Sequence, residues 1–291
     1  MLQAELVLDI GATLGEGPSW DEESRQLIWV DIDGCSVNRF DPVTGINETL
    51  DVGKRVGAAV RRKQGGLLLA LDDGFYTFNP DSGALVHLYD PEPGVTNNRL
   101  NDGKCDPYGR FWAGSMVLKG RKESAALYRM DPDGSVHTME TGVTISNGLA
   151  FDPSQGLMYY IDSITRQITR YHYDGTTGNI RNKTVAFTVS DQPGVPDGMT
   201  IDDEGMLWVA FFNGGKVVRF DPQTGCVLEE VAVPASKVTS CAFGGTDFKD
   251  LYITTAKADR YDSARDSEPL SGGLFKVNLP VPGAKSTVFS G

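Results

Sequence analysis

The feature that most limits how this chain can fold is a repeat of one short pattern. A small polar or acidic residue precedes a glycine and leads into an apolar run, as in "LGEGPSW", "ISNGLAFD" and "VPDGMTID". In six successive units, spaced by 40 to 50 residues, the same point holds a glycine or, once, a cysteine: Gly17, Gly57, Gly103, Gly148, Gly198 and Cys241. A period of this length is typical of a repeat protein.

Each unit consists of turn signals and short β-prone runs. Asp-Pro or Asn-Pro followed closely by glycine recurs in "DPVTG", "NPDSG", "DPYG", "DPDG", "DPSQG" and "DPQTG", and these residues favour tight turns. Six related runs are rich in residues that favour strands: "RQLIWVDI", "GLLLALDD", "GRFWAGSM", "GLMYYIDS", "EGMLWVAF" and "KDLYITTA". A second set, such as "SVNRFDP" and "KVVRFDP", alternates polar and apolar residues, which is the period of a strand.

Six units with four short strands each predict an all-β fold, a six-bladed β-propeller. We expect four-stranded antiparallel blades around a central channel that bears a metal, and one domain over residues 1–291. A repeated β-sandwich would have less regular internal similarity. No segment of ten or more residues is convincingly helical.

Composition narrows the classes of partner. The chain has 291 residues and a net charge of −12, which disfavours nucleic acid and anionic membranes as partners. No apolar run approaches the length of a membrane span, and the N-terminus lacks the basic start of a secretory signal. We therefore expect a cytoplasmic protein, a monomer or a weak homo-oligomer. The four cysteines form no CxxC pair, and we expect reduced, buried thiols.

In a propeller, equivalent residues of successive blades converge at one end of the axis. Glu16, Asn147 and Asp197 precede the innermost strands of blades one, four and five, whereas Val56 and Ser240 hold this position in blades two and six. In blade three the position falls within "NNRLNDGK", which supplies Asn98, Arg99, Asn101 and Asp102. The fold thus predicts a cluster of carboxylate and amide groups at one end of the channel.

Carboxylates that converge in a narrow channel repel each other and lose hydration, and a divalent cation relieves both effects. Hard oxygen ligands suit calcium, magnesium or manganese better than a structural zinc, although zinc is also held by such oxygens in open sites. Asn-Gly and Asp-Gly are common turn pairs, so Asn147 or Asp197 alone is better explained as a turn residue. Their shared position with Glu16 favours a metal site.

The histidines indicate which chemistry is available. His87, His137 and His172 all fall in outer strands or turns, so the sequence gives no support for a histidine base or a Ser-His-Asp triad. A cation with open positions polarises a carbonyl and activates water without histidine. Ester, lactone and phosphoester hydrolysis are therefore the compatible reactions.

Several motifs in order resemble the gluconolactonase/regucalcin family, which includes senescence marker protein, sugar lactonases and luciferin-regenerating enzyme. The similarity runs from about residue 6 to 278 and includes "LGEGPSWDEESRQLIWVDI", "NNRLNDGKCDPYGRFWAGSM", "ISNGLAFDPSQGLMYYIDS" and "PDGMTIDDEGMLWVAFFNGGKVVRFDPQTG". The resemblance implies a six-bladed propeller with one catalytic divalent metal and a lactone as the small-molecule substrate. Calcium is the expected ion, with zinc, manganese and magnesium as alternatives.

The resemblance also assigns residues. Glu16, Asn147 and Asp197 match the family's metal ligands, and Arg99 and Asn101 match its substrate-binding pair. We hypothesise that Asp197 also serves as the general base for the attacking water. Lys119 stands about where sugar-specific animal members carry an acid. A lysine there favours a carboxylate or phosphate on the substrate, or else points to solvent from a mobile lid.

Three other functions compete with a lactonase that acts on glucono-δ-lactone or a related lactone. The first is a non-catalytic calcium-binding protein, and the second is an esterase or phosphotriesterase that uses the same metal. The third is an interaction propeller of the WD-repeat or kelch kind, but these repeats lack the Gly-His and Trp-Asp pattern. Such propellers do not need converging carboxylates.

Overall fold

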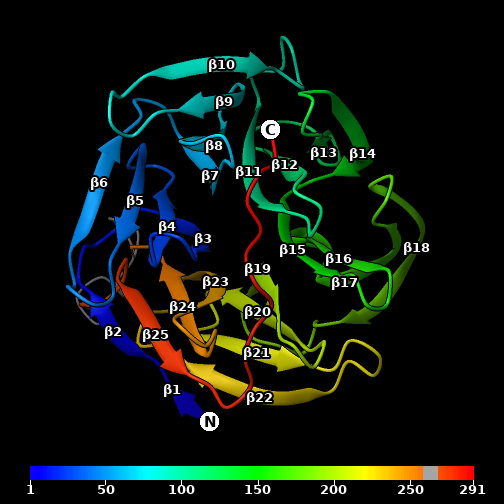
Figure 1. Cartoon of the computed structure of the whole chain (residues 1–291). Helices are drawn as coiled ribbons and strands as arrows, with labels where there is room; N and C mark the ends of the chain where they lie inside the picture. Colours follow the sequence, from blue (N-terminus) through cyan, green and yellow to red (C-terminus); the bar gives the residue numbers. More distant parts are fainter. Residues whose placement is uncertain (258–267) are drawn as a thin grey trace.

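The computed structural model describes residues 1–257 and 268–291. Six antiparallel sheets stand around a central axis like the blades of a propeller (Figure 1). This confirms the predicted all-β, six-bladed fold. Within the described residues, the only helix is the 3-10 turn η1 (Ser163–Thr165), and no helix is long and apolar enough to cross a membrane.

The blades follow one another along the chain. Blade one contains β3 (Gly15–Asp21), β4 (Gln26–Asp31), β5 (Ser36–Phe40) and β6 (Asn47–Asp51). Blade two contains β7 (Val56–Arg61), β8 (Leu67–Leu71), β9 (Gly74–Phe78) and β10 (Leu85–Tyr89). Blade three contains β11 (Asn98–Cys105), β12 (Phe111–Val117), β13 (Ala125–Met130) and β14 (Val136–Val143).

The second half of the ring repeats the pattern. Blade four contains β15 (Ser146–Asp152), β16 (Leu157–Asp162), β17 (Gln167–Asp174) and β18 (Asn179–Thr188). Blade five contains β19 (Val195–Ile201), β20 (Leu207–Phe212), β21 (Lys216–Phe220) and β22 (Val227–Ala232). Blade six contains β23 (Val238–Gly244), β24 (Asp250–Thr255) and β25 (Leu274–Asn278), and its fourth strand is β2 (Glu5–Leu8) from the N-terminus.

The N-terminal residues close the ring. β2 pairs antiparallel with β25, so blade six joins both ends of the propeller sequence in one sheet. β1 (Leu2–Gln3) adds a fifth, parallel strand to blade five by pairing with β22. This closure, which unites segments almost the whole chain apart, was not predicted from the sequence.

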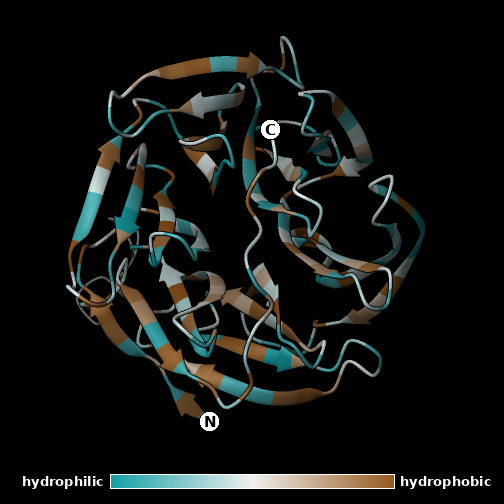
Figure 2. Cartoon of the chain, viewed as in Figure 1, coloured by the Kyte–Doolittle hydropathy of each residue, from teal (hydrophilic) through white to brown (hydrophobic). Residues whose placement is uncertain are grey.

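The β-prone runs identified in the sequence occupy equivalent places in the blades. The six apolar runs form the second strands, and the alternating runs form the third strands. Outer strands show alternating hydrophobic and hydrophilic bands (Figure 2), as expected when one face packs on a neighbouring blade. The turn signals connect strands at two places: "DPYG" and "DPSQG" follow first strands, whereas the other four follow third strands.

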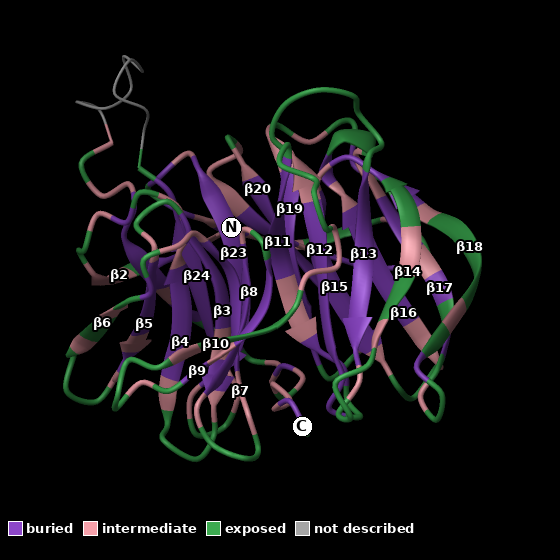
Figure 3. Cartoon of the chain, turned by 90° about the horizontal axis from the view of Figure 1, so that it is seen from above, coloured by how far each residue is buried: buried purple, intermediate pink, exposed green. Residues whose placement is uncertain are grey.

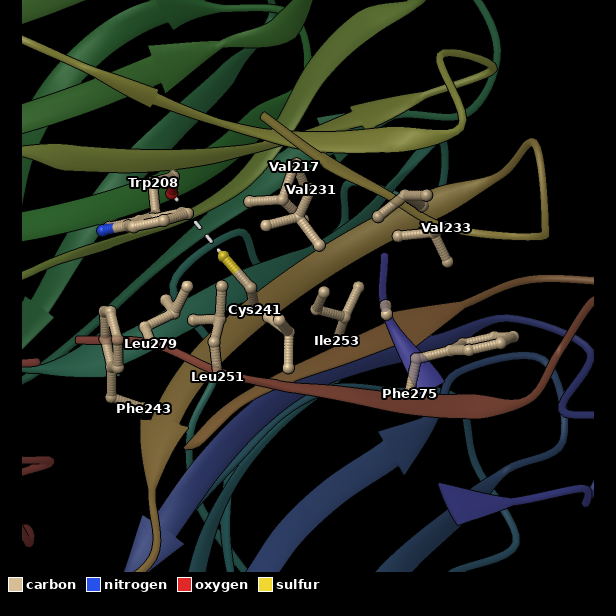
Figure 4. Packing of buried hydrophobic residues seen from close by; sticks show 14 of the residues in the cluster. Trp208, Val217, Val231, Val233, Cys241, Phe243, Leu251, Ile253, Phe275 and Leu279 are labelled. Carbon is tan, nitrogen blue, oxygen red and sulfur yellow. Dashed lines mark hydrogen bonds between the residues drawn. The ribbon is translucent and has the colours of Figure 1, made fainter. Parts of the chain in front are cut away.

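The hydrophobic core lies between blades. Six clusters of buried residues each join two neighbouring blades, so every blade packs face to face on both neighbours. Figure 4 shows the cluster between blades five and six, where Val217 and Val231 pack near Cys241, Leu251 and Ile253. The inner strands are buried, whereas exposure increases in the outer strands and connecting loops (Figure 3).

The four cysteines differ in how far they are buried. All four are free thiols, as predicted, and Cys105 and Cys241 are buried. Cys35 is half-buried and Cys226 is exposed, so the prediction of buried thiols is wrong for Cys226. Cys226 ends a turn directly before β22, the fourth strand of blade five, where residues 226–228 are exposed.

The last twelve residues, 280–291, form a segment that we call the C-terminal strap. It crosses one end of the channel (red in Figure 1) and bonds to the main chain of several blades. Ala284 N donates to Ile201 O at 3.0 Å, Phe289 N to Arg61 O at 2.8 Å and Ser290 N to Gly109 O at 3.0 Å. These acceptors lie at or just beyond the last residues of inner strands, so the strap covers the end of the channel opposite Glu16, Asn147 and Asp197.

Candidate metal centre

A local irregularity marks the repeated position in every inner strand. The register shifts at Glu16/Ser19 in blade one, Ser146/Leu149 in blade four and Pro196/Met199 in blade five. Blades two, three and six have the same shift at Val56/Ala58, Leu100/Gly103 and Val238/Ser240. A β-bulge bends a strand and turns a side chain out of its regular direction. A bulge therefore lies at or next to the repeated position in every blade, and Asn147 and Asp197 fall inside the shifted segments of β15 and β19.

The glycines after these residues permit close packing of inner strands. A Cβ on Gly148 would lie 2.7 Å from the carbonyl oxygen of Asp197 in the next blade. A Cβ on Gly57 would likewise collide with the main chain of Leu100 and Asn101. Close approach between neighbouring blades, rather than a turn, therefore explains these glycines. The turn interpretation of the Asn-Gly and Asp-Gly pairs does not apply, because both pairs lie within strands β15 and β19.

The predicted metal ligands are all buried. Glu16 is 5% exposed, Asn147 is 4% and Asp197 is 7%. The Asn147 amide donates from Nδ2 to Ser163 Oγ at 3.1 Å, which leaves its Oδ1 as a free acceptor. Oδ1 of Asn147 and Oδ1 of Asp197 are both buried with no hydrogen-bond donor in the described residues. A buried acceptor without a donor costs about 1–3 kcal/mol, and a bound cation would offset this cost at both oxygens.

The electrostatics of the cluster lead to the same conclusion. Burial, followed by the charges of Asp197 and Asp102, raises the pKa of Glu16 well above its ordinary value. Burial and the charge of Asp102 also raise the pKa of Asp197, and burial raises that of Asp102. Three mutually repelling carboxylates thus occupy one end of the channel, where a bound cation would stabilise their charged forms.

The donor set fits a hard divalent cation. It offers carboxylate oxygens from Glu16 and Asp197 and an amide oxygen from Asn147, which are the atoms that calcium, magnesium and manganese prefer. Among the described residues, no three His, Cys, Asp or Glu side chains form a group that would hold a metal by themselves. The candidate centre therefore combines two carboxylates with the amide oxygen of Asn147, not three acidic side chains.

Arg99 and Asn101 lie beside the carboxylates in β11. Arg99 Nη1 donates to Asn101 Oδ1 at 2.7 Å and to Leu100 O at 3.0 Å, and Asn101 Nδ2 donates to Ser146 O at 2.7 Å. Both ends of the Asn101 amide are thus engaged, and this amide fixes Arg99 against blade four. The remaining N–H groups of Arg99 have no hydrogen-bond acceptor in the described part of the chain.

Lys119 lies farther out. It follows β12 in an exposed loop, and its main-chain N–H donates to Asn97 O at 3.4 Å. β12 is antiparallel to β11 and Val117 pairs with Asn98, so the loop emerges at the same end of the propeller as the carboxylates. The structure therefore places Lys119 at the rim of this end, not within the buried cluster.

Asp162 and the three histidines lie outside the carboxylate cluster and have structural roles or outer positions. Asp162 accepts hydrogen bonds from Thr144 N and Ile145 N, both at 3.0 Å, and so fixes the segment before β15. His87 and His137 lie on outermost strands and His172 on a third strand, as expected. Sequence reasoning missed Ser163, which orients Asn147, because only the folded blade brings "IDS" beside "SNG".

A cavity of about 510 Å³ occupies the other end of the channel. Its walls include Lys104, Thr200 and Ala242, and residues 284–287 of the C-terminal strap close part of it. Glu16, Asn147 and Asp197 do not line this cavity. The groups that could bind a metal therefore lie outside this cavity, at the opposite end of the channel.

A family model described as the SMP-30/Gluconolactonase/LRE-like region matches residues 14–257. The chain belongs to this family. It is 42% identical over 290 residues to a Bacillus subtilis (strain 168) protein named "Putative sugar lactone lactonase YvrE", with 100% of this chain and 99% of the relative aligned. It is 38% identical to regucalcin of Xenopus laevis over 296 residues, with 100% and 99% aligned.

Solved structures of this SMP-30/gluconolactonase group share the fold closely. A luciferin-regenerating enzyme superposes with a TM-score of 0.91 at 33% identity, covering 99% of both chains. A calcium-binding protein, regucalcin, from Agrobacterium tumefaciens gives a TM-score of 0.93 at 26% identity, covering 99% of this chain and 97% of that one. The predicted family resemblance is thus confirmed over nearly the whole chain.

Proposed function

We propose that the protein is a metal-dependent lactonase that opens a lactone ring to the hydroxy acid. The observation that carries this proposal is the pair of buried, unpartnered oxygens, Asn147 Oδ1 and Asp197 Oδ1, beside the Glu16 carboxylate. The relative named "Putative sugar lactone lactonase YvrE" and the family model described as SMP-30/Gluconolactonase/LRE-like support the reaction class. A sugar lactone, such as glucono-δ-lactone, or a related lactone is the proposed substrate.

Each residue has a distinct role in this proposal. A divalent cation bound by Glu16, Asn147 and Asp197 would supply positive charge to the ester carbonyl oxygen as its carbon becomes tetrahedral. Arg99, held by Asn101, donates its free N–H groups to oxygen atoms of the substrate and orients the ring. Asp197 also accepts the proton of the attacking water, through the carboxylate oxygen that does not hold the cation.

Calcium is the proposed ion because all three side chains offer hard oxygen, and the structural relative from Agrobacterium tumefaciens is described as calcium-binding. Zinc, manganese and magnesium are the alternatives. We further propose a cytoplasmic protein with one domain over residues 1–291, a monomer or weak homo-oligomer. The net charge of −12 supports a small-molecule partner rather than nucleic acid or an anionic membrane.

The test begins with protein stripped by a chelator. Acid release from glucono-δ-lactone, pentonolactones and aliphatic lactones is measured with calcium, zinc, manganese, magnesium or no metal, and corrected for spontaneous hydrolysis. We expect turnover that depends on metal. Asp197→Asn should remove most turnover and weaken metal binding in calorimetry, and Arg99→Ala should chiefly raise KM.

Asp133→Asn is the matched control, because Asp133 is an exposed carboxylate in a turn before an outermost strand. Normal turnover by folded Asp197→Asn would refute the assignment of Asp197. Tight calcium binding without turnover on any lactone would instead support a non-catalytic calcium-binding protein. A higher kcat/KM for phosphotriesters than for lactones would identify the main reaction as phosphoester hydrolysis.

A further inference from the structure

Lys104 connects three blades inside the channel. It lies on β11 of blade three, and its ammonium donates to Leu149 O of blade four at 2.9 Å and to Met199 O of blade five at 2.6 Å. The side chain is half-buried, and part of its surface faces the cavity beneath the C-terminal strap. Lys104 thus lies at the boundary between this cavity and the carboxylate cluster.

The two carbonyl acceptors have the same place in their blades. Leu149 follows Asn147 by two residues, and Met199 follows Asp197 by two. Each acceptor is also the residue at which regular pairing resumes after the bulge, at Ser146/Leu149 in β15 and Pro196/Met199 in β19. One ammonium therefore holds the ends of both bulges that orient the proposed ligands Asn147 and Asp197.

Lys104 also supplies positive charge to this region. Its ammonium interacts favourably with the carboxylate of Asp102, which occupies the repeated position in blade three. Asp102 in turn accepts the main-chain N–H of Gly103 at 2.8 Å. Burying a lysine is costly, because the charged group loses hydration, and two strong carbonyl bonds with a nearby carboxylate offset that loss.

We infer that Lys104 is a positioning residue of the metal centre, which fixes the bulges of blades four and five so that the Asn147 and Asp197 oxygens face one point. Lys104 does not touch the substrate in this scheme. The expected effect on catalysis rests on the proposed function. The claim that Lys104 fixes the bulges of β15 and β19 does not, because it concerns the protein without metal. Residues that support metal ligands typically change metal affinity or activity by about 10–100-fold when replaced.

The test compares Lys104→Met with Lys183→Met. Lys183 is an exposed lysine on β18 that pairs with Glu140 at 3.1 Å, so its replacement removes the same charge outside the channel. Hydrogen exchange is measured on both metal-free, folded variants. We expect faster exchange of amides within 146–150 and 196–200 in Lys104→Met only. Lys104→Gln, which keeps an N–H donor, should show a smaller increase and replaces Lys104→Met if that variant does not fold.

Calorimetric titration with calcium and zinc gives the second measurement. We expect Lys104→Met to bind metal at least about tenfold more weakly and to lose kcat with little change in KM. Unchanged exchange and unchanged metal affinity in a folded Lys104 variant would overturn the inference while the proposed function stands. If the wild-type protein neither binds metal nor hydrolyses lactones, the proposed function fails, and the exchange comparison still decides whether Lys104 holds the two bulges.

Discussion

Gly148 lies so close to Asp197 that no larger residue fits between them without displacement. A Cβ at position 148 would come within 2.7 Å of the Asp197 carbonyl oxygen and within 2.7 Å of the Met199 Cβ. Gly148 follows the proposed ligand Asn147 directly, whereas Asp197 is a proposed ligand from the neighbouring blade. The spacing of the two ligands is therefore set by contact between the inner strands of blades four and five.

Gly148→Ala should push these two strands apart. Overpacking of this kind typically costs about 1–3 kcal/mol, and here it also separates Asn147 from Asp197. We expect a lower melting temperature and weaker calcium binding in calorimetry. Gly45→Ala provides the control, because Gly45 has φ of +73° in open space and its replacement strains only an outer turn. Equal metal affinity in folded Gly148→Ala and Gly45→Ala would contradict the role of this contact.

The sequence predicted the ring and the convergence because both follow from one repeat. A shared phase in the repeat singles out Glu16, Asn147 and Asp197, and in the structure each of them lies at or next to a bulge. The sequence did not reveal that Lys104 donates hydrogen bonds to Leu149 O and Met199 O. Every residue type has a main-chain carbonyl, so no residue pattern marks these acceptors. The sequence also did not predict that β2 completes blade six. The run "ELVL" is short and lies far along the chain from β25, so no turn signal connects the two strands.

Lys119 determines preference among substrates if it contacts the lactone. It is exposed on the loop after β12, at the same end as Arg99, and a lysine donates to anionic groups but accepts no hydrogen bond. Lys119→Ala should raise KM severalfold for lactones that bear a carboxylate or phosphate and leave KM for glucono-δ-lactone unchanged. Equal KM values for both substrate kinds in variant and wild type would show that Lys119 points to solvent.

Asp106 should be among the residues most important for stability. It is completely buried and accepts hydrogen bonds from Arg110 Nη1 at 3.1 Å, Trp112 Nε1 at 3.0 Å and Tyr173 OH at 2.8 Å. Asp106→Ala leaves the buried Arg110 guanidinium without its closest carboxylate, a change that typically costs about 3–5 kcal/mol.

Denaturant unfolding measures this loss of stability. Asp133→Ala is the matched control, because Asp133 belongs to an equivalent Asp-Pro-Gly turn region of the same blade but is exposed. We expect a much smaller change in its unfolding midpoint. A midpoint for Asp106→Ala as high as that of Asp133→Ala would show that this network adds little to the stability of blade three.

The four thiols should react with iodoacetamide in an order set by exposure and pKa. Burial raises the pKa of Cys241 to about 12 and raises that of Cys105 well above its ordinary value. Because a thiol is protonated below its pKa and only the thiolate reacts, raising the pH from 7 to 9 should leave both unlabelled in the native protein.

Cys226 is exposed and should be labelled first, followed by the half-buried Cys35, whose pKa is raised by burial and by the charges of Asp72 and Asp33. Mass spectrometry of peptides locates each label, and unfolding in denaturant should make all four cysteines reactive. Labelling of Cys241 at pH 9 as fast as that of Cys226 would mean that blades five and six open where Cys241 packs beneath Trp208 (Figure 4). Such opening would also expose the inner strands that carry Asp197 and Ser240, so labelling tests the rigidity on which the metal centre depends.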